Sequence, residues 1–197
     1  MYKVAVIVGS TRPTSSNLKL AKALEKLAAG KLEFNYIDIA SLPFYDDALW
    51  NDPPAEVIRL KREILDTDAV LIVTPEYNRS IPGILKNALD WPSRPYGESV
   101  WSGKPAAIAG ATGGVSGTAA AQSHLRSILP MIGLTLMGTP EIYFQSRPGA
   151  FDDDGNVADD RIRTNLGIWV DRFVEWIAKT GTPRRALEEV ERASSAA

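Results

Sequence analysis

Residues 4–17 read VAVIVGSTRPTSSN, and this stretch decides the fold class. It begins with an apolar run of strand length, residues 4–8, and passes directly into a loop of turn and helix-capping residues. An apolar run without alternation is typical of a strand that is buried on both faces, as in a parallel sheet. The stretch therefore predicts a central strand of a parallel sheet, followed by the start of a helix.

The same unit recurs along the chain. Apolar runs at residues 69–73 and 106–109 predict two more buried strands, and the alternating residues 32–36 predict a half-buried one. A weaker strand is expected near residues 134–137, which could continue to Phe144. Apolar residues at helical spacing predict helices at residues 20–30, 57–64, 84–88, 118–129 and 161–179. This alternation predicts an α/β fold, a doubly wound five-stranded parallel sheet with helices on both faces.

The length and the end of the chain bear on its domain organisation. A chain of 197 residues is long enough to bury a full hydrophobic core without disulfides or metals. We expect a single domain over residues 1–180. Residues 181–197 are charged and then rich in Ser and Ala, so we expect a frayed C-terminal tail there.

Composition excludes several classes of function. Twenty-two Lys and Arg against 24 Asp and Glu give a net charge of -2, which offers no basic excess for nucleic acid. With no cysteine and one histidine, His124, the chain lacks thiol nucleophiles, Cys-ligated metals and multi-His metal sites. No apolar run approaches the ~20 residues of a membrane span, and no signal-peptide pattern opens the chain. We expect a cytoplasmic protein with no bound metal and neither nucleic acid nor membrane as partner.

Three loops, residues 9–17, 74–82 and 110–117, each follow the carboxyl end of an apolar strand. Ligands of open parallel sheets bind outside these strand ends, so the chemistry is expected in these loops. The first loop combines hydroxyls, an amide and a guanidinium with the start of a helix, which favours a phosphate. The expected phosphate-binding residues are Ser10, Arg12, Ser15, Ser16 and Asn17.

Two further considerations bear on the first loop. In the alternative interpretation, Ser16 or Asn17 simply caps the helix, although one cap leaves the other polar side chains unexplained. The loop lacks both the Gly-Lys-Ser/Thr of nucleoside triphosphate loops and the Gly-x-Gly-x-x-Gly of dinucleotide folds. A single terminal phosphate therefore indicates a mononucleotide, and flavin mononucleotide (FMN) fits best.

The second loop and the helix after it carry a resemblance to a known family. The segments GSTR and SSN of the first loop, then TPEYNRSIPG (residues 74–83) and LKNALDW (residues 85–91), resemble the NADPH-dependent FMN reductases. This family has a flavodoxin-like fold and includes quinone, chromate and azo-dye reductases. The resemblance extends from Val4 to about Trp176.

The resemblance implies where the rest of the cofactor lies. The isoalloxazine ring is expected along the second loop, at Pro75, Glu76, Tyr77, Asn78 and Arg79, where backbone N–H groups of the loop meet the ring's polar edge. The third loop is expected to add backbone contacts, and glycine lets a flat ring approach the main chain closely. Its contributing residues are Thr112, Gly113 and Gly114.

Some positions depart from the family pattern and others match it. Gly113 stands where many relatives have proline, and Arg79 replaces a tyrosine that some members carry after Asn78. Arg126 and Glu141 match positions that some relatives use between subunits. The resemblance therefore implies a homodimer or homotetramer, with these two residues as interface candidates.

The implied activity is transfer of hydride from NADPH or NADH through FMN to a quinone, chromate, azo or similar small-molecule electron acceptor. No catalytic side chain is expected, because flavin N5 carries the chemistry and the protein binds and orients it. The alternative is a non-enzymatic electron carrier of flavodoxin type. Such carriers tend to be strongly acidic, and a net charge of -2 favours the enzyme.

Two weaker signals are left open. His124 is more typical of a packed or hydrogen-bonded residue than of a catalyst. Trp91, Tyr96 and Trp101 flank a proline-rich connection, where they could form a subunit surface or pack within one chain.

Overall fold

The computed structural model describes residues 1–181, with strands and helices that alternate as predicted. The strands are β1 (Tyr2–Val8), β2 (Leu32–Tyr36), β3 (Ala69–Thr74), β4 (Pro105–Thr112), β5 (Thr135–Leu136) and β6 (Ile142–Gln145). The helices are α1 (Ser16–Leu27), α2 (Ala55–Leu65), α3 (Gly83–Asp90), α4 (Ala119–Met131) and α5 (Asp160–Thr180), with short 3-10 turns at Asp47–Asn51 and Trp91–Ser93. The expected tail lies outside the described residues apart from Gly181.

The strands form a parallel sheet in the order β2-β1-β3-β4-β5, with β6 also paired to β4. This is the doubly wound order 2-1-3-4-5. Its switch point lies between β1 and β3, because β2 is added on one side of β1 and the later strands on the other. Every residue of β3 is buried, because helices cover both faces of the sheet. The predicted fold class is confirmed.

The fifth position of the sheet differs from the prediction. It is filled by two short segments, β5 and β6, that pair with opposite ends of β4. The connecting residues 137–141 outnumber the residues of β4 that they span, so they bulge away from the ladder. Pro140 lies in this bulge and has no N–H for the ladder, so the strand is divided rather than continuous to Phe144.

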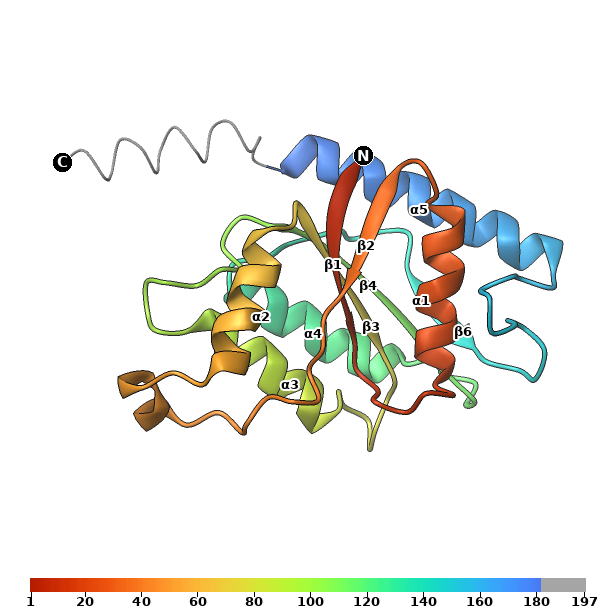
Figure 1. Ribbon diagram of the computed structural model, residues 1–197. Coiled ribbons are helices and arrows are strands. Elements are labelled where there is room, and N and C mark those ends of the chain that lie inside the picture. Colours follow the sequence, from red (N-terminus) through yellow and green to blue (C-terminus); the bar gives the residue numbers. More distant parts are fainter. Residues whose placement is uncertain (182–197) are drawn as a thin grey trace.

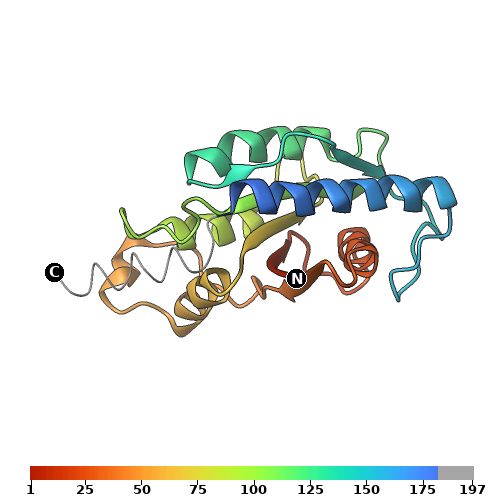
Figure 2. The same ribbon diagram turned by 90° about the horizontal axis from the view of Figure 1, so that it is seen from above.

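Two apolar layers hold the sheet between them. One joins α1 and α5 to one face of the strands, and the other joins α2, α3 and α4 to the opposite face. Figure 1 shows α2 and α3 on one side of the strands and α1 on the other, and Figure 2 shows α5 crossing between α1 and α4. Trp91 and Trp101 are buried in the second layer, so they pack within the chain, whereas Tyr96 is exposed.

Among residues 1–181, no helix is both long enough and apolar enough to cross a bilayer.

Candidate functional site

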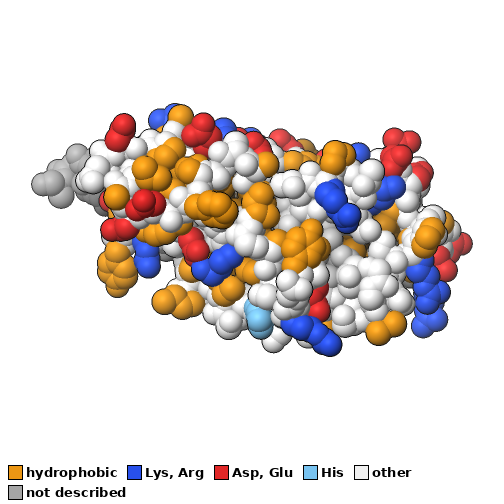
Figure 3. Space-filling view, turned by 90° about the horizontal axis from the view of Figure 1, so that it is seen from below, with side chains coloured by type: hydrophobic (Ala, Val, Ile, Leu, Met, Phe, Trp, Pro, Cys, Tyr) orange, Lys and Arg blue, Asp and Glu red, His pale blue; other side chains and the backbone are white. Residues whose placement is uncertain are grey.

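The three loops singled out in the sequence lie together at the carboxyl edge of the sheet, at the bottom of Figure 1. They follow β1, β3 and β4, which are neighbours in the sheet. Figure 3 shows this edge from below, where His124 is the one pale-blue side chain and lies among mainly white groups, with a Lys or Arg side chain nearby. The sequence therefore predicted correctly that these segments share one face.

The first loop leaves the N-terminus of α1 open. Ser15 caps the helix through its Oγ, which accepts from Asn17 N at 3.2 Å, so neither Ser16 nor Asn17 is the cap. The N–H groups of Thr11, Arg12, Thr14 and Ser16 have no partner among residues 1–181. Free N–H groups at a helix start attract an anion through their own dipoles and that of the helix.

Asn17 is engaged elsewhere. The residue is only 3% exposed, its Nδ2 donates to Ala111 O at 2.9 Å, and its Oδ1 accepts from Ala111 N at 2.9 Å. Both polar atoms of the amide therefore hold the start of α1 against the end of β4. Sequence reasoning assigned this amide to the phosphate, because nothing in the sequence reveals a partner that is 94 residues away.

The side chains of Ser10 and Arg12 make no hydrogen bond or ion pair within the described part of the chain. Arg12 is exposed, and Ser10 is half-buried. Ser16 Oγ lies 3.0 Å from Ser146 Oγ, which belongs to the segment after β6. The first loop thus has an available cation and hydroxyl beside the open helix end.

A fourth segment, residues 146–151, completes this corner of the site. It meets α1 and Gly113 around a cavity of about 300 Å³. The cavity is lined by Thr14, Ser16, Lys19, Gly113, Ser146, Arg147, Pro148, Gly149 and Phe151. Lys19 and Arg147 add two cations that sequence reasoning missed. Arg147 could have been indicated by its position just after the carboxyl end of a strand, β6.

The second loop ends in a tight turn. Tyr77 N donates to Ser80 O and Ser80 N to Tyr77 O, both at 2.9 Å, and the central residues Asn78 (φ 51°) and Arg79 (φ 65°) are left-handed. This is the pattern of a type I′ turn, in which an arginine is strained where glycine is usual. The turn uses the N–H of Tyr77, whereas those of Glu76, Asn78 and Arg79 have no partner among the described residues.

Glu76 bridges the second loop to α4. Its Oε2 accepts from Ala120 N at 2.9 Å and from Ala121 N at 3.1 Å. The N–H groups just before and after these two are also bonded: Ala119 N donates to Ser116 O, and Gln122 N donates to Thr118 O. All of the first four N–H groups of α4 are therefore satisfied, unlike those at the start of α1.

The third loop presents bare backbone. A Cβ built on Gly113 would meet nothing within 4 Å, and one on Gly114 would meet only Thr112 Cγ2 at 3.9 Å. Behind them the packing is tight, since a Cβ on Gly110 would lie 2.0 Å from Thr118 Oγ1. The main chain at Gly113 and Gly114 is thus open to a flat ligand on a rigid support.

Ser80 and His124 make a second contact between the second loop and α4. Ser80 Oγ lies 3.0 Å from His124 Nδ1, and His124 is exposed on the edge that Figure 3 shows. His124 is thus hydrogen-bonded, as its sequence context predicted. Among residues 1–181, no three His, Asp or Glu side chains are placed to hold a metal ion.

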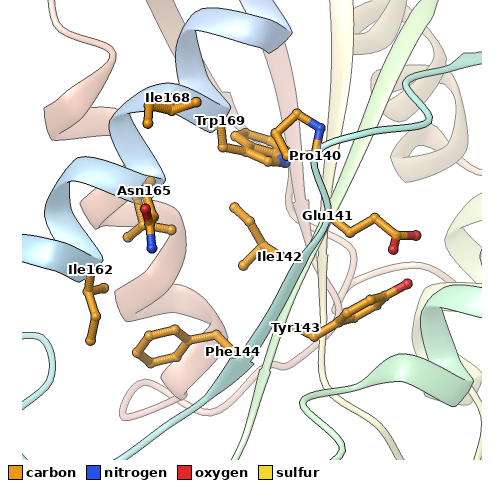
Figure 4. Close-up of a pocket in the computed structure, with 10 residues that line it drawn as sticks. Pro140, Glu141, Ile142, Tyr143, Phe144, Ile162, Asn165, Ile168 and Trp169 are labelled. Carbon is orange, nitrogen blue, oxygen red and sulfur yellow. The ribbon is translucent and has the colours of Figure 1, made fainter.

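Two larger cavities lie away from these loops. One of about 380 Å³ lies between the edge strand β6 and α5, and Figure 4 shows its lining side chains. The other, of about 550 Å³, lies where the ends of α3 and α4 meet residues 93–102. Neither cavity includes a residue of the three loops, so the free donors rather than cavity size identify the site.

Comparisons with known proteins agree with this arrangement. The family model of the NADPH-dependent FMN reductases matches residues 2–148. A 2-hydroxy-1,4-benzoquinone reductase of Burkholderia sp is 46% identical over 175 residues, covering 89% of this chain and 96% of the relative. A quinone reductase of Pseudomonas putida is 43% identical over 178 residues, covering 90% and 95%.

Solved structures include proteins similar to this chain. The flavoenzyme FerB, an NAD(P)H:(acceptor) oxidoreductase from Paracoccus denitrificans, superimposes with a TM-score of 0.90 at 50% identity, covering 92% of this chain and 100% of FerB. An archaeal flavodoxin matches with a TM-score of 0.58 at 13% identity over 89% of this chain and 99% of its own, a likeness of fold alone. The chain belongs to the family of NADPH-dependent FMN reductases.

Proposed function

We propose that FMN lies along the carboxyl edge of the sheet, with its phosphate at the start of α1 and its ring along the second loop. The observation that carries this proposal is the difference between two helix ends. The N-terminus of α1 keeps free N–H groups at Thr14 and Ser16, whereas Glu76 and its neighbours close that of α4. One helix end is therefore available to a phosphate.

The residues present fit the phosphate end. Arg12 and the hydroxyls of Ser10 and Ser16 belong to the same loop as the open N–H groups. Arg147 and Lys19 line the adjoining cavity, where Lys19 also pairs with Asp153 at 2.8 Å. Charge-assisted hydrogen bonds from such groups are about twice as strong as neutral ones. Asn17 contributes by fixing α1 on β4 through its bonds to Ala111, not through a free amide.

The residues present also fit the ring. The free N–H groups of Glu76, Asn78 and Arg79 can meet the polar edge of a flavin, and Pro75 at the start of the loop is buried. After Thr112, the third loop leaves its main chain bare of side chains at Gly113 and Gly114. Tyr77, half exposed, contributes through the turn that its backbone closes with Ser80.

As a family member, the protein is an FMN-dependent NAD(P)H oxidoreductase. When bound, FMN supplies the redox chemistry, taking hydride from NAD(P)H and passing it to an acceptor. The chain's own residues bind and orient the cofactor, and no side-chain acid or base is required of them. We expect a small quinone as acceptor, because the similar proteins from Burkholderia and Pseudomonas are named quinone reductases.

The experiment is a visible spectrum of the FMN-reconstituted protein without oxygen, before and after NADPH is added. A yellow spectrum that bleaches promptly, and returns when a benzoquinone is added, is the expected result. A yellow spectrum that persists would instead favour a flavodoxin-type carrier, and a colourless protein would overturn the FMN site itself.

The assembly proposed is a homodimer or homotetramer with Arg126 and Glu141 at its interface. Within one chain these residues form an ion pair of 2.8 Å, and Arg126 Nε is buried without a partner among residues 1–181. Burial and Glu141 raise the pKa of the neighbouring Tyr143, whereas Arg126 opposes the rise. Light scattering should give the mass of two or four chains, and Arg126→Ala should lower it.

A cytoplasmic location is part of the same proposal. It is supported by the electron donor, because reduced nicotinamide nucleotides are held inside cells. Fractionation of cells that express the full chain tests it, with the flavin-linked activity expected among the cytoplasmic proteins.

A further inference from the structure

The carboxylate of Glu76 caps a helix that is distant in sequence. Helix N-termini are usually capped by a side chain of the N-cap residue itself. The N-cap of α4, Thr118, is left-handed (φ 73°), and its side chain makes no capping bond. Instead Glu76 reaches Ala120 N and Ala121 N from 44 and 45 residues away, at 2.9 and 3.1 Å. The cap therefore also ties the second loop to α4.

The loop that Glu76 ties down contains the strained backbone of the site. Asn78 and Arg79, which follow Tyr77, are both left-handed, a conformation that Asn tolerates but that is unfavourable for Arg79. Ser80, on the far side of the turn, is tied to the same helix through His124 at 3.0 Å. Two side-chain contacts to α4 thus bracket the strained residues, and the surrounding structure maintains the strain.

The strained turn matters because Asn78 and Arg79 are exposed and their N–H groups have no partner among residues 1–181. Asn78 and Arg79 keep free donors, and they can hold a ligand only if the turn keeps its shape. A donor that must be ordered on binding contributes less than one already in place. An anchor for this turn should therefore strengthen binding of the ring without any contact of its own with the ligand.

We propose that Glu76 is a positioning residue: its carboxylate fixes residues 75–80 on α4 and so holds the donors of Asn78 and Arg79 ready for the flavin ring. This inference rests on the proposed function, and it assigns the Glu76 side chain to the loop rather than to the cofactor. It predicts that loss of the Glu76 carboxylate weakens binding of the flavin ring alone, because the phosphate is bound at the start of α1.

The test compares FMN with riboflavin, which has the same ring but no phosphate. Binding of each to the apoprotein is titrated by flavin fluorescence for the wild type, Glu76→Ala, Glu76→Gln and Asp159→Ala. Asp159 is the matched control, because its Oδ1 caps α5 by accepting from Ile162 N at 2.9 Å, away from the three loops. A melting curve of each variant reports its fold.

Glu76→Ala should weaken FMN and riboflavin alike, by about tenfold, and so leave the ratio of the two Kd values unchanged. Glu76→Gln should recover binding to within about threefold, because an amide oxygen can accept the same two bonds. Asp159→Ala should lower the melting temperature and leave both Kd values unchanged. If Glu76→Ala does not fold, Glu76→Asp replaces it, with the same loss expected from its shorter reach.

Unchanged affinities in Glu76→Ala would overturn the inference, as would an equal loss in Asp159→Ala or a loss confined to FMN. Failure of the proposed function would look different, because the wild type itself would then bind neither flavin.

Discussion

At the scale of single residues, Arg12 is the clearest candidate for contact with a phosphate. It is exposed, follows the carboxyl end of β1, and makes no ion pair within residues 1–181. A hydrogen bond to a charged group contributes about 1.5–3 kcal/mol, less where water competes. Arg12→Ala should therefore weaken FMN about tenfold by calorimetry, with riboflavin binding and the melting temperature unchanged.

Arg62 supplies the control for this prediction. It is likewise exposed and has no ion pair in the described part of the chain, but it lies near the end of α2, which leads back to the opposite edge of the sheet. Arg62→Ala should leave FMN affinity unchanged. An unchanged FMN affinity in Arg12→Ala, or an equal loss for riboflavin, would remove Arg12 from the phosphate site.

The sequence showed which residues to consider at the site, but not what each side chain touches. Ser15, Glu76 and Asn17 were all expected at the cofactor, yet their polar side chains make bonds within the protein. The partners of Glu76 and Asn17 lie on other elements, and polar loop side chains such as Ser and Asn readily bond to backbone groups. Only the folded geometry shows whether such a side chain bonds within the protein or is left for a ligand.

At the scale of elements, Asn17 joins α1 to β4. Its amide satisfies both the N–H and the C=O of Ala111, and Asn17 is buried. A buried group left without its partner costs about 1–3 kcal/mol. Asn17→Ala should therefore lower the free energy of unfolding by about 3 kcal/mol in urea titrations.

Ser15→Ala is the comparison for Asn17→Ala. It removes the cap of the same helix, which is worth about 1 kcal/mol, and leaves the contact with Ala111 in place. A loss in Asn17→Ala no larger than that in Ser15→Ala would show that the amide does not join the two elements.

The loop before α5 should respond to acid. Hydrogen bonds from the Asn156 side chain, then from the N–H groups of Asn156 and Asp154, lower the pKa of Asp152. A lowered pKa means that the charged form stabilises the fold above the ordinary carboxyl pKa of about 3.9. That stability is lost as the pH falls through the lowered pKa of Asp152 in the folded protein.

Asp152→Asn should therefore melt below the wild type at pH 7, and the gap should close as the pH falls below about 4. Asp154→Asn is the matched control, because the Asp154 carboxylate has no hydrogen bond or ion pair among residues 1–181. Melting temperatures between pH 7 and pH 3 measure both gaps. A gap for Asp152→Asn that does not change with pH would contradict the role of its charge.

Elements differ in how well the sequence predicts them. The apolar runs at residues 4–8 and 69–73 correspond to β1 and β3 within a few residues, because a strand buried on both faces must be apolar throughout. The edge position is less constrained, and there a single expected strand proved to be β5 and β6. Edge pairing depends on local backbone geometry that an apolar pattern does not record.

At the scale of the whole molecule, the proposed FMN site exists only in the folded chain. Its parts come from residues 10–17, 75–80, 112–114 and 146–149, which the order of the strands brings to one edge. An unfolded chain holds these segments apart, so FMN should bind the native state alone. Binding should then raise the stability by RT ln(1 + [L]/Kd), which is about 2.7 kcal/mol at a hundredfold excess over Kd.

For a chain of 197 residues, that stabilisation corresponds to a rise of about 5–10 °C in melting temperature. The rise should grow with the logarithm of FMN concentration in a thermal scan of the apoprotein. Arg12→Ala should need about ten times more FMN for the same rise, since only its Kd changes. Riboflavin should raise the melting temperatures of the wild type and of Arg12→Ala equally. A melting temperature that FMN does not move would mean that these four segments, although gathered at one edge, do not form a cofactor site.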